Sequence, residues 1–180
     1  MSAVIDIDAP TLRIGTRASA LALVQAQLVV DELAGIGVGA QCTTIVTDGD
    51  VRSVDTPWGE GAFVAAIERA LLDGSVDVAV HSAKDVPTDE HPGLRIAAFL
   101  PRAAAEDVLV VPAGVAATDL AGLPRGARVG TDSPRRTAFL RALRPDLHVH
   151  PIHGNVDTRL RRLDGGETDA LVLAAAGLTR

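Results

Sequence analysis

The sequence contains very little of several residue types that usually mark a function. Its 180 residues include one cysteine, one tryptophan, three phenylalanines and no tyrosine. The single cysteine, Cys42, excludes an internal disulfide and a cysteine metal cluster. No apolar run approaches the roughly 20 residues of a membrane-spanning helix, and residues 1–11 carry acids rather than the basic start of a signal peptide. We therefore expect a cytoplasmic protein with no membrane partner.

Lysine is also scarce, because Lys84 is the only lysine among seventeen basic residues. The formal net charge is −6, yet residues 124–162 contain nine arginines and only three aspartates. An acidic chain with one arginine-dense segment predicts a local polyanion site rather than a nucleic-acid surface. We expect no nucleic-acid partner.

Strand and helix patterns alternate along the chain, which predicts an α/β fold with doubly wound, mostly parallel sheets. We expect a lead-in at 1–11, a first domain at 12–100, an interdomain crossover at 101–107 and a second domain at 108–180. The predicted strands are 12–15, 41–46, 76–81, 94–99, 108–112, 127–130, 147–152 and 169–174. The predicted helices are 19–34, 63–72, 117–122, 134–143 and 156–164. Residues 51–61 predict a mobile loop.

The stretch 76–87 places four polar side chains at the end of a buried strand. His81, Ser82, Lys84 and Asp85 follow the apolar alternation and precede Pro87. Open α/β sheets bind ligands at the carboxyl ends of their strands. The alternative is a strand end with solvated charges.

Two further strands end in a Gly-Thr turn that leads into a helix. Gly15-Thr16-Arg17-Ala18-Ser19 and Gly130-Thr131-Asp132-Ser133-Pro134 share this pattern, and His153-Gly154-Asn155 is a third such turn. Helix N-termini attract anions through their free N–H groups. Ordinary capping by Ser19 explains the first turn equally well. Arg135 and Arg136 oppose the helix dipole, a cost that a bound anion would offset.

Histidines and acids are not spaced as metal ligands. His148 and His150 alternate along one predicted strand without an acidic or thiol partner at ligand spacing. We predict no metal site.

Six motifs then occur in an order that resembles the porphobilinogen deaminase family, from about residue 12 to the last residue. They are Gly15–Ala22 with Gln25, Thr47–Asp50, His81–Pro87, Gly130–Arg136, Gly154–Leu160 and Ala175–Arg180. The resemblance implies two α/β domains around a cleft, similar to type II solute-binding proteins.

The resemblance also implies an activity. Members of this family are hydroxymethylbilane synthases, transferases of tetrapyrrole (porphyrin) biosynthesis that condense four porphobilinogen units into a linear tetrapyrrole with release of ammonia. The chain grows on a dipyrromethane cofactor attached to a cysteine in a third domain. Porphobilinogen and oligopyrrole polycarboxylates are then the partners of a monomeric enzyme.

By the same resemblance Asp85 is the catalytic residue, which hydrogen-bonds pyrrole N–H groups and stabilises a cationic azafulvene. The implied carboxylate-binding residues of substrate and cofactor are Arg17, Ser19, Ser82, Lys84, Thr131, Ser133, Arg135, Arg136, His153, Gly154, Asn155, Arg159 and Arg180. Planar guanidinium groups suit the acetates and propionates of the pyrroles.

Three positions depart from the family pattern. His153 stands where the family generally has arginine, Asp132 where serine is usual, and Glu60 where lysine is frequent. The sequence also ends before a third domain, and Cys42 is not the cofactor cysteine, so we expect no sustained turnover from these 180 residues. The alternatives are a non-catalytic porphobilinogen- or tetrapyrrole-binding paralogue and a small-anion module of the solute-binding type.

Overall fold

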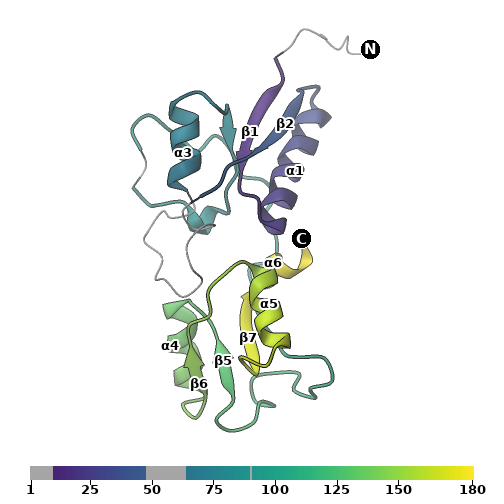
Figure 1. The fold of residues 1–180 in the computed structure, drawn as a ribbon, viewed down its shortest axis with the longest axis vertical. Helices are drawn as coiled ribbons and strands as arrows, with labels where there is room; N and C mark the ends of the chain where they lie inside the picture. Colours follow the sequence, from purple (N-terminus) through teal and green to yellow (C-terminus); the bar gives the residue numbers. More distant parts are fainter. Residues whose placement is uncertain (1–9, 48–63, 90) are drawn as a thin grey trace. The chain divides into compact units, whose positions relative to one another are not determined.

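The computed structural model describes residues 10–47, 64–89 and 91–180. The chain divides into two compact units, Met1–Pro101 and Arg102–Arg180, which follow one another from purple to yellow in Figure 1. The predicted loop at 51–61, including Glu60, lies outside the described residues. Within the described part of the chain, no helix is long and apolar enough to cross a membrane.

The first unit is a three-stranded parallel sheet with the order β2-β1-β3. Its strands are β1 (Leu12–Thr16), β2 (Ala40–Thr44) and β3 (Val78–Ala79), and its helices are α1 (Ala20–Gly35), α3 (Ala65–Leu72) and the 3₁₀ turn η1 (Ala83–Asp85). Leu12 lies opposite Ala40 and Ile14 opposite Val78. The predicted alternation of strand and helix is confirmed here.

Helices cover both faces of this sheet. Successive residues of β1 point to opposite faces, so neighbouring β1 residues contact different helices. A Cβ on Gly15 would lie 3.2 Å from the Ile67 side chain of α3, whereas the Thr16 hydroxyl donates to the Ala22 carbonyl of α1 at 3.2 Å. Ile14, on the same side as Thr16, is fully buried.

The second unit is a four-stranded sheet with the order β4-β7-β5-β6. Its strands are β4 (Asp107–Val110), β5 (Arg128–Gly130), β6 (His148–His150) and β7 (Ala170–Ala174), and its helices are α4 (Pro134–Leu143), α5 (Val156–Asp164) and α6 (Ala176–Thr179). Only the β4–β7 pair is antiparallel. The mostly parallel α/β class is confirmed.

Two hydrophobic clusters lie on opposite faces of the second sheet. Leu140 of α4 packs in one cluster with Ala170, and Leu163 of α5 packs in the other with Leu171. Since Ala170 and Leu171 are consecutive residues of β7, their side chains point to opposite faces. The sheet is therefore covered on both sides, as a doubly wound fold requires.

Two predicted elements are wrong. Residues 94–99 form no strand in the described structure, and Ile96 and Phe99 are 46% and 72% exposed. Residues 117–122 form bends and a turn instead of a helix, and the Asp119 carboxylate accepts the N–H of Gly122 at 2.8 Å. Such local bonds compete with helix formation.

Candidate functional site

The predicted site residues fall into two groups, one in each unit, and both follow the carboxyl ends of parallel strands. In the first unit, β1 ends at the buried Thr16 and the chain turns through Arg17 into α1. Ser19 is the N-cap of α1, where its hydroxyl accepts the N–H of Ala22 at 3.4 Å. Arg17 is half-buried beside this cap.

A side-chain contact joins α1 to the segment after β3. The Gln25 amide N–H donates to the Ser82 hydroxyl at 2.9 Å, and that hydroxyl lies 3.2 Å from the Gln25 carbonyl oxygen as a donor. Ser82 begins η1, where Lys84 and Asp85 are both exposed. The structure therefore presents the predicted catalytic carboxylate to solvent next to a fixed hydroxyl.

His81 is one of the four polar side chains predicted at this strand end, but the family resemblance gave it no role. Its Nε2 is buried and has no hydrogen-bond partner among the described residues. Burial lowers the pKa of His81; Glu68 and Asp85 oppose that shift and Arg17 adds to it. The His81 imidazole therefore lies within electrostatic reach of both Arg17 and Asp85. Its place at a strand end was the signal available from sequence.

In the second unit, the turn after β5 leads into α4. Thr131 is 2% exposed, and its N–H donates to the His150 carbonyl at 3.0 Å. The Ser133 hydroxyl caps α4 by accepting the N–H of Arg136 at 3.3 Å. Pro134 occupies the first helical turn, where a missing N–H costs nothing.

Asp107 pairs with two of the three arginines of α4. Arg136 Nη2 lies 2.6 Å from Asp107 Oδ1, and Arg135 Nη2 lies 3.5 Å from Oδ2. The Arg136 side chain is only 13% exposed, and its Nη1 donates to the Val172 carbonyl at 3.2 Å. Its Nε is buried without a partner in the described part of the chain. Sequence reasoning missed Asp107, since it lies 29 residues away at the start of β4.

Asp132 joins two other predicted residues. Its Oδ2 lies 2.9 Å from His153 Nδ1 and 3.1 Å from Arg159 Nη2. Arg159 Nε also donates to the Gly154 carbonyl at 2.7 Å. Burial lowers the pKa of Arg159; Asp132 opposes that shift and Arg136 adds to it. Two half-buried guanidinium groups thus repel each other here, an arrangement that favours an anion.

The two remaining predicted site residues, Asn155 and Arg180, adjoin the helices α5 and α6. Asn155 occupies the N-cap position of α5 and is half-buried, and Arg180 follows α6 and is exposed. His148 and His150 lie in β6, and no described cluster of three histidines, cysteines or acids could hold a metal.

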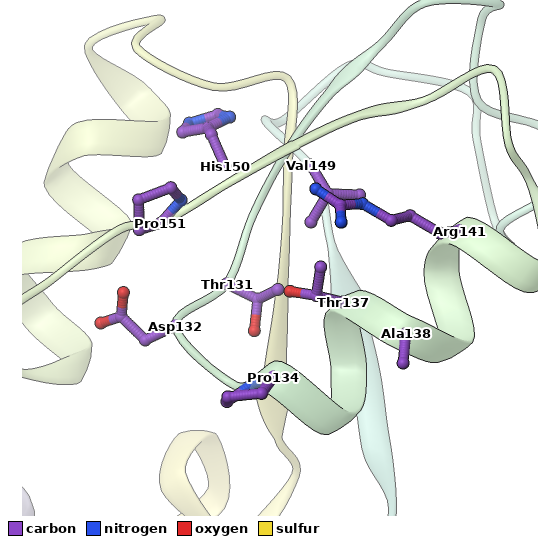
Figure 2. A pocket seen from close by; sticks show the side chains of 9 residues that line it. All are labelled: Thr131, Asp132, Pro134, Thr137, Ala138, Arg141, Val149, His150 and Pro151. Carbon is purple, nitrogen blue, oxygen red and sulfur yellow. The ribbon is translucent and has the colours of Figure 1, made fainter.

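A pocket of about 380 Å³ adjoins the turn after β5. Figure 2 shows Thr131 and Asp132 from the turn, Thr137 and Arg141 from α4, and His150 from β6 around it. Its walls are mixed, because Pro134, Ala138, Val149 and Pro151 lie among the hydroxyls, the guanidinium and the carboxylate.

These observations define an α/β protein in which arginines and hydroxyls gather at the carboxyl ends of parallel strands, as in binding sites for carboxylates. Residues 12–180 match the sequence model described as "Porphobilinogen deaminase, dipyromethane cofactor binding domain". The chain belongs to the porphobilinogen deaminase family.

Similar proteins include porphobilinogen deaminases from Acidothermus cellulolyticus (51% identical over 173 residues, 94% of this chain and 51% of the relative) and Roseiflexus sp. strain RS-1 (51% over 175 residues, 94% and 57%). The relative from Mycobacterium marinum is 48% identical over 170 residues, covering 94% of this chain and 53% of the relative. The chain spans about half the length of the curated relatives it matches.

Solved structures similar to the chain include an ancestral arginine-binding protein bound to arginine, with 19% identity and a TM-score of 0.47 over 94% of this chain and 72% of the other. The ancestral amino acid-binding protein AncCDT-1 gives 16% identity and a TM-score of 0.45 over 92% and 70%.

Proposed function

We propose that this chain supplies substrate- and cofactor-binding domains of a hydroxymethylbilane synthase. The match of residues 12–180 to the family's cofactor-binding domain carries the proposal. In the reaction, the C–N bond of the porphobilinogen aminomethyl group breaks and ammonia leaves. A C–C bond then forms to the terminal pyrrole of the growing chain, whose α-hydrogen leaves as a proton. Four such condensations add four units, and water would then cleave the bond to the cofactor and release one linear tetrapyrrole.

Asp85 is the catalytic residue of this proposal. Its exposed carboxylate, in the 3₁₀ turn η1 that follows β3, accepts hydrogen bonds from pyrrole N–H groups. As ammonia leaves, positive charge develops on the substrate, and a nearby carboxylate stabilises that charge. Burial lowers the pKa of His81 and so disfavours a second positive charge beside Asp85.

The residues in the second unit fit a dipyrromethane, whose pyrroles carry carboxylates. Arg136 offers a buried Nε without a partner among the described residues, and Arg159 is a desolvated cation. Such guanidinium groups bind carboxylates through paired N–H donors. When bound, the cofactor supplies the terminal pyrrole that accepts the first unit, while Ser133, Arg135, Arg136 and Arg159 hold its carboxylates. Arg17, Ser19, Ser82 and Lys84 of the first unit bind further ligand carboxylates.

We further infer that the protein is a cytoplasmic monomer with no nucleic-acid or membrane partner. The formal net charge of −6 supports the absence of nucleic-acid and membrane partners, because phosphate backbones and anionic lipid surfaces are repelled overall. Light scattering of the purified protein tests the oligomeric state.

The native polypeptide from its own source tests the activity. We expect it to release one ammonia per porphobilinogen consumed and to carry the added mass of two pyrrole rings. Asp85→Asn should lower the rate at least about 100-fold with porphobilinogen binding retained. Asp89→Asn, an exposed aspartate of the same unit, is the matched control and should keep full activity. Equal rates for both variants would show that Asp85 is not the catalytic residue, and no ammonia release by the wild type would favour a non-catalytic binding protein.

A further inference from the structure

Asp132 is the point at which three separate segments of the second unit meet. It follows β5, His153 follows β6, and Arg159 projects from α5. One carboxylate oxygen, Oδ2, lies within hydrogen-bond distance of both His153 Nδ1 and Arg159 Nη2. The three side chains are only 19–24% exposed, so water screens their charges less than it would at the surface.

On one side of the Arg159 guanidinium, the N–H donors already form hydrogen bonds within the protein. Its Nε is bound to the Gly154 carbonyl and its Nη2 to Asp132. A bidentate carboxylate needs two parallel N–H donors. A ligand carboxylate that approached the Nε–Nη2 side would therefore have to replace the Asp132 oxygen, whose charge is the same as its own.

The second carboxylate oxygen of Asp132, Oδ1, has a different environment. Oδ1 is buried and has no hydrogen-bond partner within residues 10–47, 64–89 and 91–180. A buried acceptor without a donor is costly, and Asp132 also lines the pocket in Figure 2. A small movement of Asp132 would offer this oxygen to a ligand N–H group, whereas a ligand carboxylate would be repelled by it.

We propose that Asp132 is a specificity-determining residue of the second unit, an internal carboxylate that competes with ligand carboxylates for Arg159. It disfavours ligands that present only negative charge and favours those that also carry N–H donors. The proposal rests on the proposed carboxylate binding by Arg159. The chemistry that it selects is a carboxylate joined to a donor group, as in an amino- or pyrrole-bearing acid.

The test measures binding of succinate, a plain dicarboxylate, to the full 180-residue chain by calorimetry. Asp132→Asn keeps the side-chain shape and removes the charge, and should tighten succinate binding about tenfold. Asp132→Glu restores the carboxylate and should bind within about twofold of wild type. Asp164→Asn removes the same charge from an exposed position of α5 and should change nothing. Unchanged or weaker succinate binding in Asp132→Asn, or an equal gain in Asp164→Asn, would overturn the proposal.

A second measurement uses only the wild-type chain, so it tests the proposal even if a variant does not fold. Succinate should shift the NMR signals of the Arg159 Nε–H group and the Asp132 carboxyl carbon together, and no shift of either would overturn the proposal. Porphobilinogen is titrated in parallel. Failure to bind porphobilinogen while succinate behaves as expected would refute the proposed function and leave the role of Asp132 intact.

Discussion

Arg13 holds Asp77 at three points. Its backbone N–H donates to Asp77 Oδ2 at 2.8 Å, its Nε donates to the same oxygen at 3.0 Å, and its Nη2 donates to Oδ1 at 2.7 Å. The N–H of Asp77 in turn donates to the Arg13 carbonyl at 2.8 Å. The pair therefore ties β1 to the segment that enters β3.

The second unit repeats this arrangement with Arg128 and Asp169. The corresponding distances are 2.8, 3.2 and 2.7 Å, and the N–H of Asp169 donates to the Arg128 carbonyl at 2.9 Å. In both units the arginine lies two residues before the strand glycine, so the two units share a local construction as well as a sequence motif.

The Arg13–Asp77 pair predicts an acid-sensitive stability. Its hydrogen bonds lower the pKa of Asp77 to about 2, below the ordinary value of about 3.9. The carboxylate therefore stabilises the fold above pH 4, and this contribution is lost as the pH falls from about 4 to 2. Asp77→Asn should flatten the urea-midpoint curve in that range, whereas the exposed Asp89→Asn should not. Identical curves for wild type and Asp77→Asn would contradict the prediction.

His81 predicts a second pH effect, in a higher range. Burial lowers its pKa below 6.5, so the unfolded chain binds more protons than the folded one just below pH 6.5. Stability should then fall as the pH drops through that window. His81→Gln should remove this slope, measured by urea unfolding at several pH values. His91→Gln, in an exposed turn, is the control, and an imidazole NMR titration with a midpoint above 6.5 would refute the idea.

Gly130 should not tolerate a side chain. A Cβ there would lie 2.9 Å from both Ile152 and Leu171, two buried residues of the core. Overpacking of this kind costs about 1–3 kcal/mol, so Gly130→Ala should lower the free energy of unfolding by that amount. Gly35→Ala is the control, because nothing lies within 4 Å of the added Cβ and alanine suits a helix better. Chemical denaturation measures both, and equal stability of the two variants would be the contrary result.

Ser133 has a capping role that can be separated from ligand binding. Ser133→Ala removes the α4 cap and should cost about 1 kcal/mol. Ser133→Asp keeps a capping oxygen but adds a negative charge, so it should retain stability and weaken carboxylate binding about tenfold. Thermal unfolding and succinate calorimetry report the two properties. If Ser133→Asp bound succinate like wild type, Ser133 would not lie near the ligand carboxylate.

Local patterns in the sequence predicted most of the fold. The helices at 134–143 and 156–164 agree with α4 and α5 at both ends, because Ser133, Pro134 and Asn155 are strong start signals. The predicted strand at 94–99 is wrong because a strand also needs a neighbouring strand with which to form hydrogen bonds. Whether such a neighbour is present depends on the whole fold and not on the residues of the segment itself.

The sequence predicted where the candidate site residues lie along the chain, but not which residues they contact. Turn chemistry placed Asp132 just after a strand and Arg136 in the first turn of the following helix, where the structure has them. Their partners, Asp107 and His153, lie 29 and 21 residues away in sequence. The sequence presented Asp132 and His153 as two separate departures from the family pattern, whereas the structure makes them one contact. The roles of these residues in binding and catalysis stay predictions.

The two arginine–aspartate pairs lie where the parallel strands begin, and the candidate ligand groups lie where the same strands end. Substitutions that strengthen the fold can thus accumulate at one rim without changing the residues at the other. Such a division gives the chain evolvability, because residues at the ligand rim can change while the other rim preserves the scaffold. It also tells a protein engineer which rim to mutate for heat resistance and which for a new ligand.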